Sequence, residues 1–459
     1  MPELHLDPGR VSRLPSDDAR LVQRTVPLGP VDPWSLLDAP QVSGEHLAAW
    51  HDPEEDRSFL ALGRARVVRV HGESRFADAD RALSEMAASR RGVAAELPFA
   101  LAGFAFSPDE RRTGPWADWG DGALWVPELL VHRQAGEHVA VLTASAPDAE
   151  ARLGALRQRL DELLERAHDG AVPSPGRGVP EPRATEQRES WRRNVNQARA
   201  EMADGKLHKV VLARSEALHS PSGSFDAVAT ARALREGQEH CVSWMVRRHG
   251  GQAFVGATPE ELVRLHGSHL RTVALAGTRS RGATPEEDEA LGQELFASEK
   301  DRREQDLVVG AIAEALAPFT TGLDIPAVPE QALFRYVRHL RSTIRAEVRP
   351  QVSLLQLVES LHPTPAVGGL PRELALSTLT RLEAMDRGWY AGPLGWLSAD
   401  GDGVFVVALR SALMRAGLAV AYAGCGLLAQ SDADAEWDET GHKLRAVRQA
   451  LRPGSMEIC

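Results

Sequence analysis

Residues 403–451 read GVFVVALRSALMRAGLAVAYAGCGLLAQSDADAEWDETGHKLRAVRQAL, and this stretch decides the fold. Residues 403–412 and 418–423 are mostly apolar, which predicts a pair of strands. Residues 431–451 have helical periodicity, and Ser431 and Asp432 are candidate caps at their start. The segment therefore predicts two strands followed by a closing helix.

The preceding part of the carboxyl-terminal half has similar periodic segments. Residues 189–204 predict a helix, and KVVLAR at 209–214 predicts a short buried strand. Residues 297–316 predict one long amphipathic helix. Nearly every segment after residue 190 is thus assigned to a helix or a strand.

The amino-terminal part alternates short strands with helical stretches rich in Ala and Arg. We expect strands at 59–62, 65–70, 124–131 and 138–142. Residues 167–188 contain four prolines among Gly, Ser and charged residues, so they predict a surface connection.

Composition narrows the class of protein. The 459 residues are 43% hydrophobic and 25% charged, which is typical of a soluble globular protein. A net charge of −11 argues against nucleic acid or an anionic membrane as a general partner. The three cysteines are far apart, which predicts neither a disulfide framework nor a zinc site. No signal sequence or membrane-spanning run is evident, so we expect a cytoplasmic protein.

Closely spaced carboxylates occur on two separate predicted helices. Asp301 and Glu304 are one turn apart on a face that continues into apolar residues, and Glu436, Glu439 and Lys443 line one stripe of the closing helix. If the two stripes meet, their oxygens suit a hard cation such as Mg²⁺. Spacing alone favours the alternative, a pair of solvated, salt-bridged surface helices.

Four further residues have both a functional and an ordinary interpretation. Lys209 begins an apolar strand, where its amine could be desolvated into a base or could reach water at the strand end. Glu260, after Pro259, could be a general acid at a strand terminus or part of a surface turn. Arg410 lies within an apolar strand and needs an anion, from the protein or from a ligand. Tyr390 fits either the core or a ligand contact.

Taken together, the ordered motifs resemble the isochorismate synthases of the chorismate-utilising enzyme family. They are KVVLAR (209–214), FVGATPE (254–260), LAGTRSRG (275–282), SEKDRREQ (298–305), LHPTPAVGGLP (361–371), WYAGPLGW (389–396), VVALRSA (406–412) and the stretch 423–443, with LAGFAF (101–106) in the amino-terminal half.

The resemblance implies one large α/β (α+β) fold over residues 1–459, with two antiparallel sheets packed together and flanked by helices. Residues 1–188 would be the more variable half, with the proline-rich stretch as an internal loop, and residues 189–459 the catalytic core. It also implies chorismate as substrate and a monomer or weak homo-oligomer.

The resemblance implies specific roles. Lys209 would activate the water that adds at C2 of chorismate, and Glu260 would protonate the departing C4 hydroxyl. The predicted Mg²⁺ site consists of Asp301, Glu304, Glu436 and Glu439. The predicted substrate-binding residues are Gly277, Thr278, His362, Ala366, Tyr390, Arg410, Gly424, Gly426 and Lys443. Many relatives have His where Gln305 stands, and we expect the carboxylates to keep metal binding despite this difference.

Three positions favour isochorismate as the product. Lys209 favours water over ammonia as the nucleophile, which argues against an anthranilate synthase. Ala276 stands where covalent aminodeoxychorismate synthases have lysine, and Ala366 stands where salicylate synthases tend to have threonine. A salicylate synthase remains the alternative, and a non-catalytic relative that only binds chorismate is the hypothesis from another class.

Overall fold

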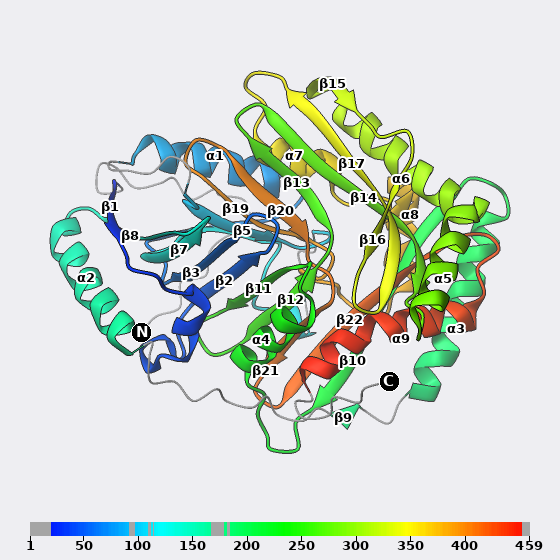
Figure 1. Ribbon diagram of the computed structural model, residues 1–459, viewed down its shortest axis with the longest axis horizontal. Helices are drawn as coiled ribbons and strands as arrows, with labels where there is room; N and C mark the ends of the chain where they lie inside the picture. Colours follow the sequence, from blue (N-terminus) through cyan, green and yellow to red (C-terminus); the bar gives the residue numbers. More distant parts are fainter. Residues whose placement is uncertain are drawn as a thin grey trace.

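The computed structural model describes residues 20–90, 97–108, 112, 114–166, 179–180 and 184–451. Within these residues the strands form two sheets, one of 12 strands and one of 10, and the pairings are antiparallel. The predicted α/β (α+β) architecture with two antiparallel sheets and flanking helices is confirmed (Figure 1). Most of the proline-rich stretch 167–188 lies outside the described residues.

The 12-stranded sheet joins a block of strands from the amino-terminal half to a block from the carboxyl-terminal half. In spatial order they are β1 (Leu21–Pro27), β8 (Glu137–Ser145), β7 (Leu129–Gln134), β3 (Arg57–Leu62), β2 (Leu47–Asp52), β11 (Val242–Arg247), β12 (Ala253–Thr258), β21 (Ser411–Arg415), β22 (Leu418–Leu427), β10 (Lys209–His219) and β18 (Gly369–Leu370), with β9 (Val179–Pro180) paired to β10.

The 10-stranded sheet mixes the two halves in the same way. Its order is β15 (Thr320–Asp324), β17 (Val337–Val348), β14 (His269–Ser280), β13 (Glu261–His266), β20 (Gly403–Val407), β19 (Pro393–Leu397), β5 (Ala100–Phe104), β6 (Gly122–Val126) and β4 (Arg66–Val70), with β16 (Glu330–Leu333) paired to β17. Both sheets thus depend on strands from before and after residue 188, which supports a single structural unit.

Helices cover the outer surfaces of the sheets (Figure 1). The helices α1 (Arg75–Ala88), α5 (Pro285–Ala297), α6 (Glu299–Leu316) and α7 (Leu354–Leu361) contact the 10-stranded sheet. The helices α2 (Ala149–Arg166), α3 (Ala184–Met202), α4 (Ala227–Gly237), α8 (Arg372–Leu382) and α9 (Ala433–Ala450) contact the 12-stranded sheet. Short 3-10 turns lie at Pro33–Asp38, Pro40–Val42 and Gly114–Trp116.

The main core cluster joins the two sheets. It contains Phe59 and Phe254 from the 12-stranded sheet and Phe104 and Phe405 from the 10-stranded sheet, all fully buried. A second cluster fills the space between the 12-stranded sheet and α2, α4 and α9. Central strands such as β3 are therefore buried on both faces, which explains why their sequences are apolar runs without clear alternation.

Three predicted elements are each divided in the structure. The expected strand 403–412 is β20 in one sheet and β21 in the other, because the chain turns at Arg410, whose φ is 47°. The expected strand 124–131 likewise becomes β6 and β7 in different sheets. The expected helix 297–316 is interrupted at Ser298, which is extended and caps α6 by accepting a hydrogen bond from the Asp301 amide. The closing helix begins after Asp432, whose side chain caps it as predicted.

Within the described ranges, no helix combines the length and apolar character needed to cross a bilayer.

Candidate active site

A pocket of about 160 Å³ lies between the carboxyl-terminal parts of the two sheets, with α6 and α9 beside it. Strands β10 and β22 of one sheet and β14 and β17 of the other supply its walls. The predicted site residues that line it are Lys209, Glu260, Gly277, Thr278, Asp301, Glu304, Ala366, Tyr390, Arg410, Gly424, Gly426, Glu436, Glu439 and Lys443. The fold therefore brings together residues from well-separated parts of the sequence.

Lys209 is buried at the start of β10, with 2% of its side chain exposed. Its Nζ donates a hydrogen bond to Glu304 Oε1 at 2.7 Å. The lysine therefore points into the pocket, and the interpretation of a strand-end lysine that reaches water is excluded. Burial acts to raise the pKa of Glu304, but Lys209 outweighs it, so the pKa is lowered and the carboxylate is charged.

Glu260 lies in the link between β12 and β13 and is buried. Burial raises its pKa from 4.5 to about 7, against the opposing effect of Lys209 and of a hydrogen bond from Thr364. Thr364 Oγ1 is 3.4 Å from Glu260 Oε1. A buried carboxyl with this pKa is partly protonated near neutral pH, as a general acid requires.

The other carboxylates of the pocket come from α6 and α9, as the helical spacing predicted. Asp301 accepts a hydrogen bond from Arg279 at 2.7 Å, and Glu439 is paired with Lys443 at 2.8 Å. Glu436 is buried and forms no ion pair within the described part of the chain. Burial and then the charge of Glu439 raise its pKa.

Three of the pocket carboxylates form ion pairs with basic side chains. The pairs are Arg279–Asp301, Lys209–Glu304 and Lys443–Glu439. In the part of the chain that the structure describes, no three acidic, histidine or cysteine side chains converge closely enough to hold a metal ion. The two acidic stripes therefore share one pocket, and their carboxylates interact with cationic side chains of the protein itself.

Arg410 occupies the turn between β20 and β21, and its side chain lines the pocket. Its guanidinium donates to Gln238 Oε1 at 3.1 Å and lies over the Phe334 ring. It forms no ion pair with any carboxylate among the described residues. Of the two sources of an anion considered from the sequence, a ligand carboxylate is therefore the one that the pocket favours.

Tyr390 is buried and also lines the pocket. Its ring stacks on Tyr422 with centroids 5.1 Å apart. Burial raises the pKa of Tyr390 to about 12, so the phenol stays protonated and its hydroxyl remains a hydrogen-bond donor.

Glycine is required where site residues approach the backbone closely. A Cβ at position 426 would lie 2.9 Å from Lys209 Cε and 3.2 Å from Glu304 Oε1. Gly277 has a φ of +64°, and a Cβ there would lie 3.0 Å from the Asp301 Cβ. The close approach expected at these glycines thus involves side chains of the protein itself, namely Lys209, Glu304 and Asp301.

His362 is the predicted site residue that the structure places elsewhere. It does not line the pocket. Its Nε2 is 2.9 Å from the Phe106 carbonyl oxygen, and its ring packs edge-on against Phe76 and Phe106. The motif LHPTPAVGGLP identified the correct loop, but it is Ala366 and Val367 that reach the pocket.

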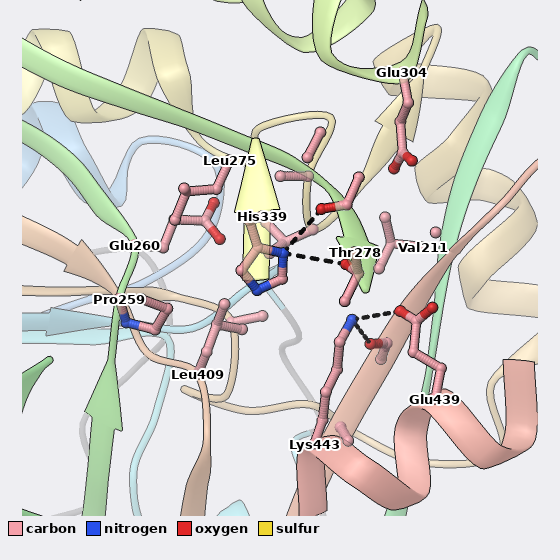
Figure 2. Close-up of a pocket in the computed structure, with 18 of the residues that line it drawn as sticks. Val211, Pro259, Glu260, Leu275, Thr278, Glu304, His339, Leu409, Glu439 and Lys443 are labelled. Carbon is pink, nitrogen blue, oxygen red and sulfur yellow. Dashed lines mark hydrogen bonds and ion pairs between the residues drawn. The ribbon is translucent and has the colours of Figure 1, made fainter. Parts of the chain in front are cut away.

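Sequence reasoning missed His339, which lies on β17 and lines the pocket. Its Nδ1 is 3.1 Å from both the Gly277 carbonyl and Thr278 Oγ1 (Figure 2). Burial, followed by Arg410 and Lys443, lowers its pKa to about 3, so the ring is neutral. Because Nδ1 must donate to the carbonyl, Nε2 is a hydrogen-bond acceptor. No isolated signal in the sequence marks this histidine.

Arg387 was also missed, and it holds three parts of the pocket together. Its guanidinium pairs with Glu383, and it donates to the carbonyl oxygens of Val211 at 2.6 Å and Val367 at 2.9 Å. Glu383 in turn accepts a hydrogen bond from the Ala213 amide at 2.7 Å. The pair therefore fixes β10, which carries Lys209, relative to the loop that carries Ala366.

Gln305, noted for its departure from many relatives, faces the core. It is buried, and its amide donates to the Ala274 carbonyl at 3.2 Å and to Ser342 Oγ at 3.0 Å. The side chain thus anchors α6 to β14 and β17, leaving Asp301 and Glu304 directed at the pocket.

Comparison with known proteins gives consistent matches over nearly the whole chain. The family model described as chorismate binding enzyme matches residues 11–452. The salicylate biosynthesis isochorismate synthase of Pseudomonas aeruginosa is 37% identical over 94% of this chain and 90% of its own. Isochorismate synthase MenF of Bacillus subtilis is 30% identical over 88% and 87% of the two chains. The solved structure of the menaquinone-specific isochorismate synthase MenF from Escherichia coli has a TM-score of 0.80 at 28% identity, covering 95% of each chain.

Proposed function

Because the chain belongs to the family of chorismate binding enzymes, we infer that it is an isochorismate synthase, an enzyme that converts chorismate to isochorismate. The observation that carries the mechanism is the pocket that holds a buried lysine and a buried carboxyl of raised pKa together. The reaction needs one of each, since water adds at C2 while the C4 hydroxyl departs.

We propose that Lys209 is the base and Glu260 the acid. The neutral amine of Lys209 takes a proton from the attacking water, and its hydrogen bond to Glu304 Oε1 at 2.7 Å holds Nζ in position. Glu260 gives its proton to the departing hydroxyl, which leaves as water. Since Glu260 has a pKa of about 7, it supplies that proton without being so weak an acid that transfer is slow.

We propose that the two carboxylates of chorismate occupy separate parts of the pocket. One carboxylate would bind Arg410, a planar guanidinium without a carboxylate partner among the described residues, with the Tyr390 hydroxyl as a further donor from the pocket lining. The other would bind Lys443, whose Nζ in this structure donates to the Gly424 carbonyl at 2.9 Å. In Figure 2, Glu260 and the Lys443–Glu439 pair lie on different sides of His339. The neutral Nε2 of His339 is suited to accept a hydrogen bond from a substrate hydroxyl.

The acidic residues fit a hard divalent cation by their chemistry. Glu436 is buried against Glu439 without an ion pair to a basic side chain in the described part of the chain, so this corner of the pocket carries excess negative charge. We propose that Asp301, Glu304, Glu436 and Glu439 hold Mg²⁺. The ion would neutralise and position a substrate carboxylate. Asp301, Glu304 and Glu439 would then exchange their present basic partners for it.

The test of this function is chromatography of the products formed by purified protein from chorismate and Mg²⁺. Isochorismate as the accumulating product is the expected result. Salicylate with pyruvate would instead establish the salicylate synthase alternative. Unchanged chorismate, in protein that binds it by calorimetry, would establish the non-catalytic relative.

A further inference from the structure

A second small cavity lies apart from the chorismate pocket, where the β4 edge of the 10-stranded sheet meets β11 of the other sheet. Its volume is about 30 Å³. Its polar lining consists of Arg64, Arg69, Arg248 and His46, and its walls include Trp119, Trp125 and Trp389. None of these residues lines the chorismate pocket.

The arginines concentrate positive charge without a matching acid. Among the described residues, no carboxylate lies within ion-pair distance of Arg64, Arg69 or Arg248, although the chain as a whole has a net charge of −11. Burial lowers the pKa of Arg248, repulsion from Arg69 and Arg64 adds to this, and Asp118 opposes it. Arg64 and Arg69 are exposed and Arg248 is half-buried, so the three guanidinium groups can reach an anion from solvent, and such an anion would reduce their mutual repulsion.

His46 adds an unsatisfied donor to the same cavity. Both of its ring nitrogens are buried and have no hydrogen-bond partner. Burial, followed by Arg64 and Arg248, lowers its pKa to about 3, so the ring is neutral and carries one N–H group. A buried N–H without a partner loses its hydrogen bond to water without replacement, which makes it unusual in a native protein.

The walls of the cavity are fixed by the surrounding structure. Trp119 Nε1 donates to Gln252 at 2.7 Å, and Trp389 Nε1 donates to the Gly120 carbonyl at 3.2 Å. The Trp125 ring meets His46 edge-on with centroids 5.4 Å apart. The guanidinium of Arg248 lies over Trp119 at 5.7 Å. The site is thus largely preformed, as binding sites for small ligands usually are.

We propose that this cavity is a second binding site, specific for a small oxyanion such as a carboxylate or a phosphate group. Guanidinium forks bind such groups through paired hydrogen bonds, and the His46 N–H would add a further donor. A cavity of about 30 Å³ has room for a few atoms only, so only the anionic group of a larger ligand can enter it. The remainder of the ligand lies over Val67, which is 40% exposed.

The three tryptophans provide a direct readout. Purified full-length protein is titrated with benzoate, acetate and inorganic phosphate, at an ionic strength held constant with chloride. Binding is followed by tryptophan fluorescence and by calorimetry. We expect saturable binding, tightest for benzoate if the ligand is an aromatic carboxylate and tightest for phosphate if it is a phosphate group. A signal that chloride reproduces at equal ionic strength would overturn the proposal.

Variants assign the binding to this cavity. Arg248→Gln and Arg69→Gln should each weaken it at least tenfold, because each removes one guanidinium fork. Arg152→Gln is the matched control, since Arg152 is an exposed arginine on α2 that forms no ion pair with any described residue. Circular dichroism checks that each variant is folded.

A variant of the chorismate pocket separates the two sites. Arg410→Gln should leave anion binding in the second cavity intact. If Arg410→Gln abolishes the binding while Arg248→Gln and Arg69→Gln do not, the anion occupies the chorismate pocket, and the second site does not exist. This outcome is independent of whether the enzyme makes isochorismate.

Discussion

The raised pKa of Glu260 makes the pH dependence of both activity and stability predictable. As the proposed acid, Glu260 must be protonated before catalysis, and burial places its pKa at about 7. We therefore expect kcat/KM to fall about tenfold per pH unit well above pH 7. Glu260→Gln should lose at least about 10²-fold in turnover, and its residual rate should lack this alkaline limb.

The raised pKa of Glu260 also predicts how the free energy of unfolding depends on pH. The pKa is raised from 4.5 to about 7, so the folded state binds the proton more tightly than the unfolded state. The resulting stability is fully present below pH 4.5 and is lost as pH rises through 7. Above that pH the ionised, buried carboxylate costs about 3 kcal/mol. Glu260→Gln cannot ionise and avoids this cost, so its stability relative to wild type should increase between pH 5 and pH 8.5.

The assay is urea unfolding of wild type and Glu260→Gln at the two pH values in excess chelator, beside steady-state pH profiles with Mg²⁺. Glu314→Gln is the control, because Glu314 is exposed on α6, and its relative stability should not change with pH. A relative stability of Glu260→Gln that is independent of pH would refute the raised pKa. An unchanged alkaline limb in Glu260→Gln would show that another group causes it.

The remaining predictions concern the base, the substrate carboxylate and the metal. Lys209→Ala should lose at least about 10²-fold in turnover yet bind chorismate in calorimetry with Mg²⁺; near-parental turnover would reject lysine as the base. Arg410→Lys should reduce kcat/KM strongly with the fold retained, because a point charge replaces a planar fork, and equal kinetics would make Arg410 structural. Excess chelator should abolish turnover and Mg²⁺ restore it, and full activity in chelator would contradict a metal requirement. Glu439→Gln should weaken Mg²⁺ and chorismate binding together in calorimetry, and parental affinities would place Glu439 outside the site.

The sequence predicted whether a segment is a helix or a strand better than it predicted where the segment ends or which sheet it joins. The apolar run at 403–412 was correctly assigned to extended structure, yet it crosses from one sheet to the other at Arg410. Periodicity measures burial, and both β20 and β21 are buried, so the pattern contains no sign of the crossing. Ser298 was detectable in principle, since a serine followed three residues later by Asp301 is typical of a helix start.

The site shows the same division between local and long-range information. Helical spacing was enough to place Asp301 and Glu304 on one face, and Glu436 and Glu439 on another. That both faces meet in one pocket follows only from the packing of α6 and α9 around the strands between them. Arg387 was invisible because its partner carbonyl at Val211 is 176 residues away. His362 was misplaced because a motif identifies a loop but does not fix which side chains face the ligand.

The burial of Lys209 and Glu260 bears on the choice between catalysis and simple binding. Lys209 is 2% exposed and Glu260 6% exposed, so both ionisable groups are removed from water. Replacing a buried charged pair by apolar residues of similar size is often neutral or stabilising, whereas the charged groups incur a desolvation penalty. A protein that only bound chorismate could hold its carboxylates with Arg410 and Lys443 and would be more stable with apolar residues at 209 and 260. Proton transfer by the proposed base and acid would account for the burial of both groups in one pocket.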